Sequence, residues 1–355
     1  MSLNSASPPL GVIEFPETFA ECIASHQASP LPFEQLLALI EAVSCSSWES
    51  LRDLITRIDL TSYSYPELAI LNSYLAVESW IHWDLAALDR LFAASLGKAA
   101  QEKETSAGRH AQAHMKLCAR LMVLRLRSPE QYQPDDAPAT LHVIGDSHSL
   151  CFSALPIVWK GRLTIARAMP VRGVKMFHLG AGVPAKYRQF LRWRLKSLQP
   201  GSEILLSMGE IDARPNEGIF PQAFKAGMAN LKGFEQITQA TVREFVRFVT
   251  SQIADTGHVS ENVTLMGIPP IGYDIRQGLP PGASVQQFRS FNARVNAVMR
   301  EHALAAGWTY IDLQAGAMRM NPTQSKNARI DDFHLGPTFY KSLDAWRVAP
   351  PTSGA

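Results

Sequence analysis

Two short segments of the chain contain the residue types that acyl transfer needs, namely a serine, a histidine and an aspartate. The segments are Gly145-Asp146-Ser147-His148-Ser149 and Asp331-Asp332-Phe333-His334. A nucleophilic hydroxyl needs a base within hydrogen-bond reach and a carboxylate that orients the base. We therefore expect Ser147 to be the nucleophile, His334 the general base and Asp331 its orienting acid. Asp332 is the alternative acid, with a less natural spacing to His334.

The position of Ser147 suits this role. It follows an apolar run over 141–144 that predicts a buried strand, and parallel sheets present reactive side chains at the carboxyl ends of their strands. At a turn from strand to helix, the hydroxyl projects clear of the sheet and the serine's own N–H can meet a developing oxyanion. Most Gly-Asp-Ser tripeptides are plain turns, so the assignment depends on the later aspartate and histidine.

The elements that must position these groups alternate in type after residue 139. Short apolar runs predict strands over 140–144, 162–167, 174–179, 203–208, 262–268 and 308–313. Amphipathic stretches predict helices at about 148–158, 184–198, 221–255 and 284–306. This alternation predicts a parallel sheet covered on both faces. We expect an α/β domain over 140–347, followed by a tail over 348–355.

The first part of the chain has a different pattern. Residues 1–31 are rich in Pro and Ser and predict an irregular leader, whereas apolar residues recur at helical spacing over 32–128. Ser46 and Ser64 are each followed three residues later by a glutamate, the spacing of a capping box. A polar segment with three prolines over 129–139 predicts a linker.

Two architectures stay open for the helical domain. An irregular bundle is favoured over degenerate helical repeats. Ser47-Trp48 and Ser79-Trp80 are separated by about a tetratricopeptide period, but the other repeat positions do not align. Such a domain commonly covers a site or binds a partner protein, and the sequence does not decide between these roles.

The composition is that of an ordinary soluble globular protein. The 355 residues are 46% apolar and 19% charged, which predicts two domains with a large core. A net charge of +2 is too small to indicate a nucleic-acid or membrane partner. No apolar run approaches the roughly 18 to 20 residues that span a bilayer.

The expected location is the cytoplasm. The N-terminus lacks a basic region, and Pro8 and Pro9 interrupt the place where a signal peptide has its apolar stretch. The four cysteines have neither CxxC spacing nor the density of a disulfide scaffold, which fits a reducing compartment.

Four blocks of the sequence resemble, in order, those of the GDSL or SGNH hydrolases. They are Gly145-Asp146-Ser147, the glycine block Phe177 to Gly182, Gly209-Glu210-Ile211-Asp212 and Asp331-x-x-His334. The resemblance covers about 140 to 345 and leaves the helical half unexplained. It implies a three-layer α/β/α, flavodoxin-like parallel sheet and an esterase, deacylase or acyltransferase that forms an acyl-enzyme without a cofactor or metal. It also implies that Gly180 or Gly182 donates a backbone contact to the oxyanion.

One position departs from the family pattern. The third block is usually Gly-x-Asn-Asp, whose asparagine amide completes the oxyanion hole, and here that position is Ile211. Losing such a donor costs on the order of 100- to 1000-fold in rate. Arg214 is the nearest substitute and Asn216 a poorer one. If neither replaces the amide, we expect a slow enzyme.

Three further residues are candidates for supporting roles. Glu210 and Asp212 are expected to brace the site through Arg214, with a purely structural ion pair as an equal alternative. His148 is a candidate contact for the leaving group, although a solvated histidine at a helix N-terminus is the more common case.

Two other functions stay open. Asp146-Ser147-His148 also fits the opening Asp-x-His of a metal-dependent phosphoesterase, but no Gly-Asn-His block or late His-x-His pair follows. A binding module on the same fold draws support from Ile211. The favoured interpretation is an enzyme acting on a small-molecule, glycan or carrier-bound ester, and the sequence does not identify which.

Overall fold

The computed structural model describes most of the chain. The described residues are 32–44, 48–84, 86–87, 106–127, 139–183, 185–228, 230–270, 278–319, 329–330 and 334–350. The predicted leader, nearly all of the predicted linker and the predicted cap at Ser46 lie outside these residues. The domain boundaries stay predictions.

A seven-stranded sheet lies at the centre, in the spatial order β2-β3-β1-β4-β5-β6-β7. The five inner strands are parallel, and β2 and β7 are antiparallel strands at the two edges. The strands are β1 Thr140–Gly145, β2 Leu155–Trp159, β3 Arg162–Pro170, β4 Glu203–Ser207, β5 Val263–Met266, β6 Thr309–Ile311 and β7 Arg347–Val348. The predicted α/β fold class with a preceding helical region is confirmed.

One face of the sheet packs against long amphipathic helices. Ile144 of β1 and Leu206 of β4 join side chains of α8, α10 and α11 in a single apolar core. The helices that follow the nucleophile segment are α7 Met176–Ala181, α8 Ala185–Lys196, α9 Ile219–Lys225, α10 Leu231–Asp255, α11 Val285–Ala305, α12 Leu313–Met318 and α14 Pro337–Tyr340.

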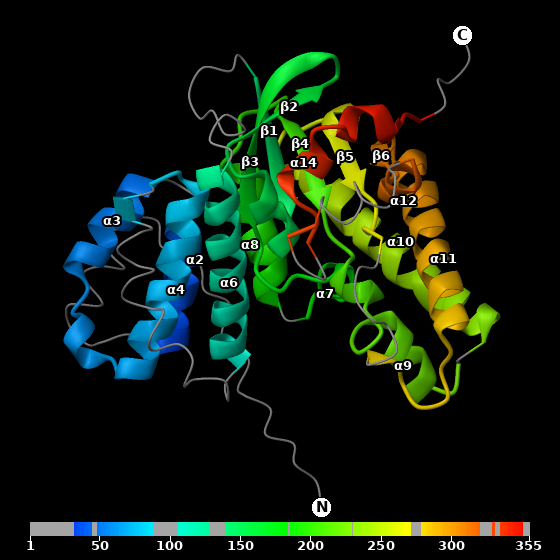
Figure 1. Ribbon diagram of the computed structural model, residues 1–355, viewed down its shortest axis with the longest axis horizontal. Helices are drawn as coiled ribbons and strands as arrows, with labels where there is room; N and C mark the ends of the chain where they lie inside the picture. The colour runs from blue at the N-terminus through cyan, green and yellow to red at the C-terminus, as the bar shows by residue number, and fades with distance from the viewer. Residues whose placement is uncertain are drawn as a thin grey trace, which may run out of the picture.

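Two of the N-terminal helices, α4 Tyr65–Ile81 and α6 Ser106–Arg127, contribute to the opposite face. The other two are α2 Phe33–Ser44 and α3 Trp48–Arg57. Trp80 of α4 and Leu121 of α6 share an apolar core with Val143 of β1, since alternate side chains of a strand point to opposite faces. Figure 1 shows these four helices gathered on one side of the sheet, with α9, α10 and α11 on the other.

Local sequence explains the start of α4. The Glu67 carboxylate accepts from the N–H and the hydroxyl of Ser64, at 2.8 and 2.7 Å, and Pro66 lies in the first turn. The predicted pairing of Ser64 with Glu67 is therefore confirmed.

Three predicted elements are wrong. The helix predicted at 148–158 is a short 3₁₀ helix, η4 Ser147–Phe152, followed by β2. The turn Lys160-Gly161 has positive φ at both residues, the geometry that favours a tight hairpin, so β2 pairs with β3. The strand predicted at 174–179 is mostly helix α7. The helix predicted at 221–255 is two helices, because Asn230 caps α10 by accepting from the Gly233 N–H at 2.8 Å.

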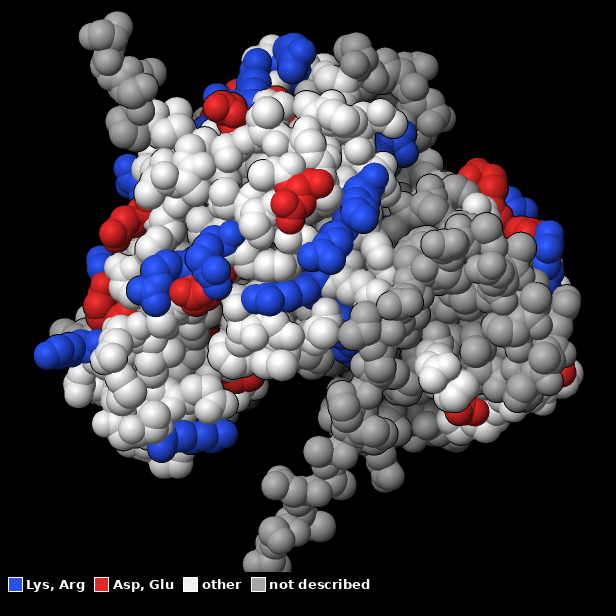
Figure 2. Space-filling model, turned by 180° about the vertical axis from the view of Figure 1, so that it is seen from behind, with Lys and Arg blue, Asp and Glu red and all other residues white. Residues whose placement is uncertain are grey.

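Charged side chains are distributed over the surface in small groups. In Figure 2, several Lys and Arg side chains form a diagonal row near the centre of the rear face, and others lie beside Asp and Glu. Within the described residues, no helix combines the length and apolar character needed to cross a membrane.

Candidate active site

Gly145 determines how β1 ends. A Cβ at this position would lie 1.9 Å from the Ser207 carbonyl oxygen of the neighbouring strand β4. The next N–H, that of Asp146, donates to the same oxygen at 3.1 Å. Only glycine allows this close approach, which fixes the turn that carries the predicted nucleophile.

Ser147 opens the 3₁₀ helix η4 at the carboxyl end of β1. Its Oγ lies 2.9 Å from Nε2 of His334, a hydrogen bond between residues far apart in the sequence. The Ser147 side chain is half-buried, and in the described part of the chain its N–H has no acceptor. The structure therefore brings the expected nucleophile and base together, with an N–H beside them that is available to a ligand.

The expected acid cannot be placed. Asp331 and its alternative Asp332 lie outside the described residues. His334 itself is only 8% exposed, and its carbonyl accepts from the Ile330 N–H at 2.9 Å. The role of Asp331 stays a prediction.

His148 is buried, so the solvated alternative is wrong. Its side chain lies against Asp146, with Nδ1 3.1 Å from Oδ1, and the same oxygen accepts from the His148 N–H at 2.9 Å. The imidazole also contacts that of His334, with ring centroids 4.6 Å apart. Two imidazoles and a carboxylate therefore surround Ser147.

The surroundings of Asp146 favour the charged form of its carboxyl group. Burial alone would raise its pKa, but the charge and hydrogen bonds of His148 and the charge of Arg214 lower the pKa below its usual range. Its second oxygen, Oδ2, is buried and has no hydrogen-bond partner among the described residues. Asp146 lines a small cavity with His148, Ser207 and Glu210. Single ligand atoms of Asp146, His148 and Glu210 lie within 4.8 Å of one another. These groups suit a cation geometrically, although Arg214 adds positive charge nearby.

The block after β4 holds the helix beside the site. The Asp212 carboxylate accepts from the N–H groups of Met176 and Phe177, at 2.7 and 3.2 Å, and so fixes the first turn of α7. Burial raises the pKa of Asp212 to about 7, although these two N–H groups act in the opposite direction. Ile211 is buried at the start of a short 3₁₀ turn and has no side-chain donor.

Arg214 is paired with carboxylates. Its Nε and Nη2 contact the Glu210 carboxylate at 2.7 to 3.0 Å, and its Nη1 donates to Glu217 at 2.7 Å. Glu217 also binds Lys175, the residue before α7, at 3.2 Å. These contacts favour Arg214 as a brace over Arg214 as an oxyanion donor. Asn216, the poorer candidate, has no hydrogen bond described here.

The predicted oxyanion glycines are used elsewhere in the described structure. The Gly180 Cα packs on α10, where an added Cβ would lie 3.0 Å from Glu244, and Gly182 ends α7 with φ of 76°. Neither has a described contact with Ser147. The residue after β3 that contacts the nucleophile turn is Val171, whose N–H donates to the Gly145 carbonyl at 2.6 Å. Sequence analysis missed it because β3 extends to Pro170, three residues beyond the predicted strand.

The N-terminal helix α4 binds the nucleophile segment directly. Trp80 donates from Nε1 to the Leu150 carbonyl at 3.0 Å, and Ser153 donates to the Trp80 carbonyl at 2.8 Å. Arg172, next to Val171, pairs with the buried Glu78 of the same helix. The helical region thus supports two loops of the candidate site.

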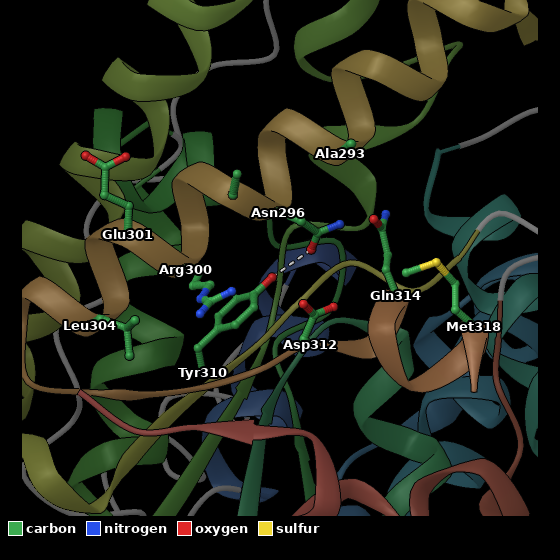
Figure 3. Close-up of a pocket in the computed structure, with 10 residues that line it drawn as sticks. Ala293, Asn296, Arg300, Glu301, Leu304, Tyr310, Asp312, Gln314 and Met318 are labelled. Carbon is green, nitrogen blue, oxygen red and sulfur yellow. Dashed lines mark hydrogen bonds between the residues drawn. The ribbon is translucent and has the colours of Figure 1, made fainter. Parts of the chain in front are cut away.

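A larger cavity lies away from these groups. It has a volume of about 410 Å³ between α11, β6 and α12 (Figure 3). Tyr310 donates to Asn296 at 2.8 Å within it, and Glu301 points away from this pair. None of its lining residues belongs to the predicted site. The chemistry therefore places the candidate site at Ser147 and not in the larger cavity.

Comparison with known proteins finds solved structures that resemble this one. No family model matches the sequence, and no curated protein matches it. The structure is similar to that of a lipase/acylhydrolase from Enterococcus faecalis, with 18% identity over 59% of this chain and 92% of that one and a TM-score of 0.38. It is also similar to LAE5, an alpha/beta hydrolase enzyme from the metagenome of Lake Arreo, Spain, with 15% identity over 60% and 94% and a TM-score of 0.34. Similarity at this level does not establish a shared function.

Proposed function

We propose that this protein is a serine-dependent ester hydrolase or acyl transferase with Ser147 as nucleophile and His334 as general base. The observation that carries the proposal is the hydrogen bond of 2.9 Å between Ser147 Oγ and His334 Nε2. An activated hydroxyl requires this contact. The SGNH-type blocks of the sequence support the same assignment.

The reaction proceeds in two halves. The Ser147 proton moves to His334 Nε2 as Oγ attacks the ester carbonyl, and the protonated imidazole then returns that proton to the leaving alcohol. Water or an acceptor alcohol gives a proton to His334 as it attacks the carbonyl of the acyl-enzyme. The imidazolium then returns this proton to Ser147 Oγ as the bond between Oγ and the acyl group breaks. Asp331 would orient the imidazole in both halves.

Backbone groups supply the oxyanion contacts in this proposal. The Ser147 N–H is the proposed donor to the oxyanion, since it belongs to the nucleophile itself and has no acceptor among the described residues. Ile211 offers no donor, and the Arg214 guanidinium contacts two carboxylates. With one donor fewer than the family pattern, turnover is expected to be on the order of 100-fold slower than with a full oxyanion hole.

Replacing the nucleophile tests this function. Ser147→Ala is expected to abolish hydrolysis of short p-nitrophenyl esters and to leave the melting temperature near that of the wild type, because a half-buried serine at a turn contributes little packing. Ser251→Ala on α10, which removes a hydroxyl bonded to the Phe248 carbonyl, is the matched control and keeps full activity. Wild-type rates in Ser147→Ala would exclude the assignment.

A metal-dependent phosphoesterase is the second candidate. The cluster of Asp146, His148 and Glu210 favours it, because a histidine and two carboxylates are common ligands of divalent metals. The two functions differ in their response to chelators. The serine mechanism predicts ester hydrolysis that is indifferent to EDTA, whereas cleavage of bis-p-nitrophenyl phosphate that requires Mn²⁺ or Zn²⁺ would favour the metal mechanism.

The proposed substrate is a small-molecule, glycan or carrier-bound ester. The proposed location is the cytoplasm, which the buried free thiols of Cys118 and Cys151 support.

A further inference from the structure

We propose that Asp146 and His148 form a second carboxylate–imidazole pair, which acts as a positioning device for His334. This inference rests on the proposed function. In it, His148 touches neither the substrate nor the reacting atoms. It fixes the plane of the His334 ring, and with it the direction of the Nε2 lone pair toward Ser147.

Asp146 contacts both the backbone and the side chain of His148. One carboxylate oxygen, Oδ1, accepts from the backbone N–H of His148 and lies 3.1 Å from its ring Nδ1. Both residues are 1% exposed, so water does not compete for these contacts. A ring fixed at its backbone and at one nitrogen has little freedom to rotate.

The fixed ring lies against the general base. The His148 and His334 centroids are 4.6 Å apart and the planes are inclined by 36°. His334 enters the site from a segment whose described backbone pairing consists of the bridge between Arg329 and Leu335 and one bond from Ile330. Contact with this fixed ring limits the orientations that the His334 imidazole can adopt.

The loop after β4 places a third charged group near Asp146 and His148. A carboxylate oxygen of Glu210 lies within 4.8 Å of the ligand atoms of both Asp146 and His148. Glu210 is held by Arg214, which is held in turn by Glu217. The Gly-Glu-Ile-Asp block thus places a carboxylate beside the pair, and Arg214 contributes by holding Glu210.

Three substitutions test the inference with p-nitrophenyl acetate as substrate. His148→Ala removes the ring, His148→Phe keeps a ring and loses the link to Asp146, and Asp146→Asn keeps an acceptor for the His148 N–H and removes the charge. His258→Phe is the matched control, because His258 is also buried but bonds the Leu195 carbonyl at 3.0 Å and is not among the site residues.

Misplacement of the base affects the chemical step more than binding. His148→Ala is expected to lower kcat by roughly 100-fold with KM changed by less than about twofold. His148→Phe and Asp146→Asn should retain more activity, with kcat lowered roughly tenfold. The partial rescue by phenylalanine distinguishes positioning by a ring from a general loss of folding, and the melting temperatures check the fold.

The outcomes separate this inference from the proposed function. If Ser147→Ala is inactive but the His148 and Asp146 variants keep wild-type kcat, the function stands and the inference is wrong. If all variants lose kcat in proportion to their melting temperatures, with no rescue by phenylalanine, His148 is structural and the inference is also wrong. Loss of wild-type ester hydrolysis in EDTA, restored by Mn²⁺, would make His148 a metal ligand and overturn both.

Discussion

At the scale of single residues, Arg214 separates two accounts of the oxyanion site. Paired with Glu210 and Glu217, it is expected to act as a brace. Removing one partner of a largely buried ion pair leaves the other uncompensated. Arg214→Ala should then lower the free energy of unfolding by about 3 kcal/mol together with kcat.

A double-mutant cycle measures this coupling by urea unfolding. In the brace account, Glu210→Gln costs little once Arg214 is absent, because the buried carboxylate no longer lacks its partner. A large loss of kcat in Arg214→Ala with unchanged stability would instead support direct contact with the oxyanion.

Asp212 should make stability depend on pH. Its pKa rises from 3.8 to about 7 on folding because burial disfavours the charge. The contribution of Asp212 to the free energy of unfolding is therefore fully present below about pH 3.8 and is lost as the pH rises through 7. The loss is at most about 4 kcal/mol. Asp212→Asn lacks this titration.

Unfolding free energies measured across this pH range check the sign. The stability advantage of the wild type over Asp212→Asn should shrink as the pH rises from 4 to 8. An advantage that grows with pH would show that the two N–H groups outweigh burial.

At the scale of elements, the sequence predicts the strands and helices that a local pattern of apolar residues determines. The apolar runs at β1, β3, β4, β5 and β6 are recovered to within a few residues, and the Gly-Asp-Ser turn follows from β1. Helix α7 is not recovered, because residues 174–179 form a short apolar run and their helical turn is fixed by the distant Asp212. The helix after Ser147 is predicted too long, because η4 ends at Phe152 and β2 follows. Contacts with the distant α4 support η4, and the local sequence does not show them.

Helix α4 should therefore influence catalysis. Trp80→Phe removes the donor to the Leu150 carbonyl within the element that carries Ser147. We expect a loss of about 1 to 3 kcal/mol in unfolding free energy and a lower kcat. Trp308→Phe is the control, because Trp308 is equally buried but its Nε1 has no hydrogen-bond partner described here. Equal kcat in the two variants would contradict the support by α4.

At the scale of the whole molecule, the helical region and the sheet share a core. Residues of α4 and α6 pack on β1. The apolar pattern of 32–128 predicts helices but does not show what they pack against, so this shared core could not be predicted. The sequence likewise could not show that α4 supports the site, because the contacts join residues about 70 positions apart.

Removing the helices should expose that core. A fragment of residues 139–355 is expected to be insoluble or to lack a cooperative urea transition, since one face of its sheet loses its cover. The full chain serves as the reference under the same conditions. A fragment that unfolds cooperatively and hydrolyses esters would show that the helical region is a separate appendage.

The whole account depends on the reactivity of one hydroxyl. Labelling of the full-length protein with a fluorophosphonate, followed by mass-spectrometric mapping of the modified residue, measures that reactivity directly. We expect a single adduct on Ser147, which is lost in Ser147→Ala and forms much more slowly in His334→Ala because the base no longer activates the hydroxyl. An adduct on another residue, or labelling of Ser147 at the same rate without His334, would contradict it.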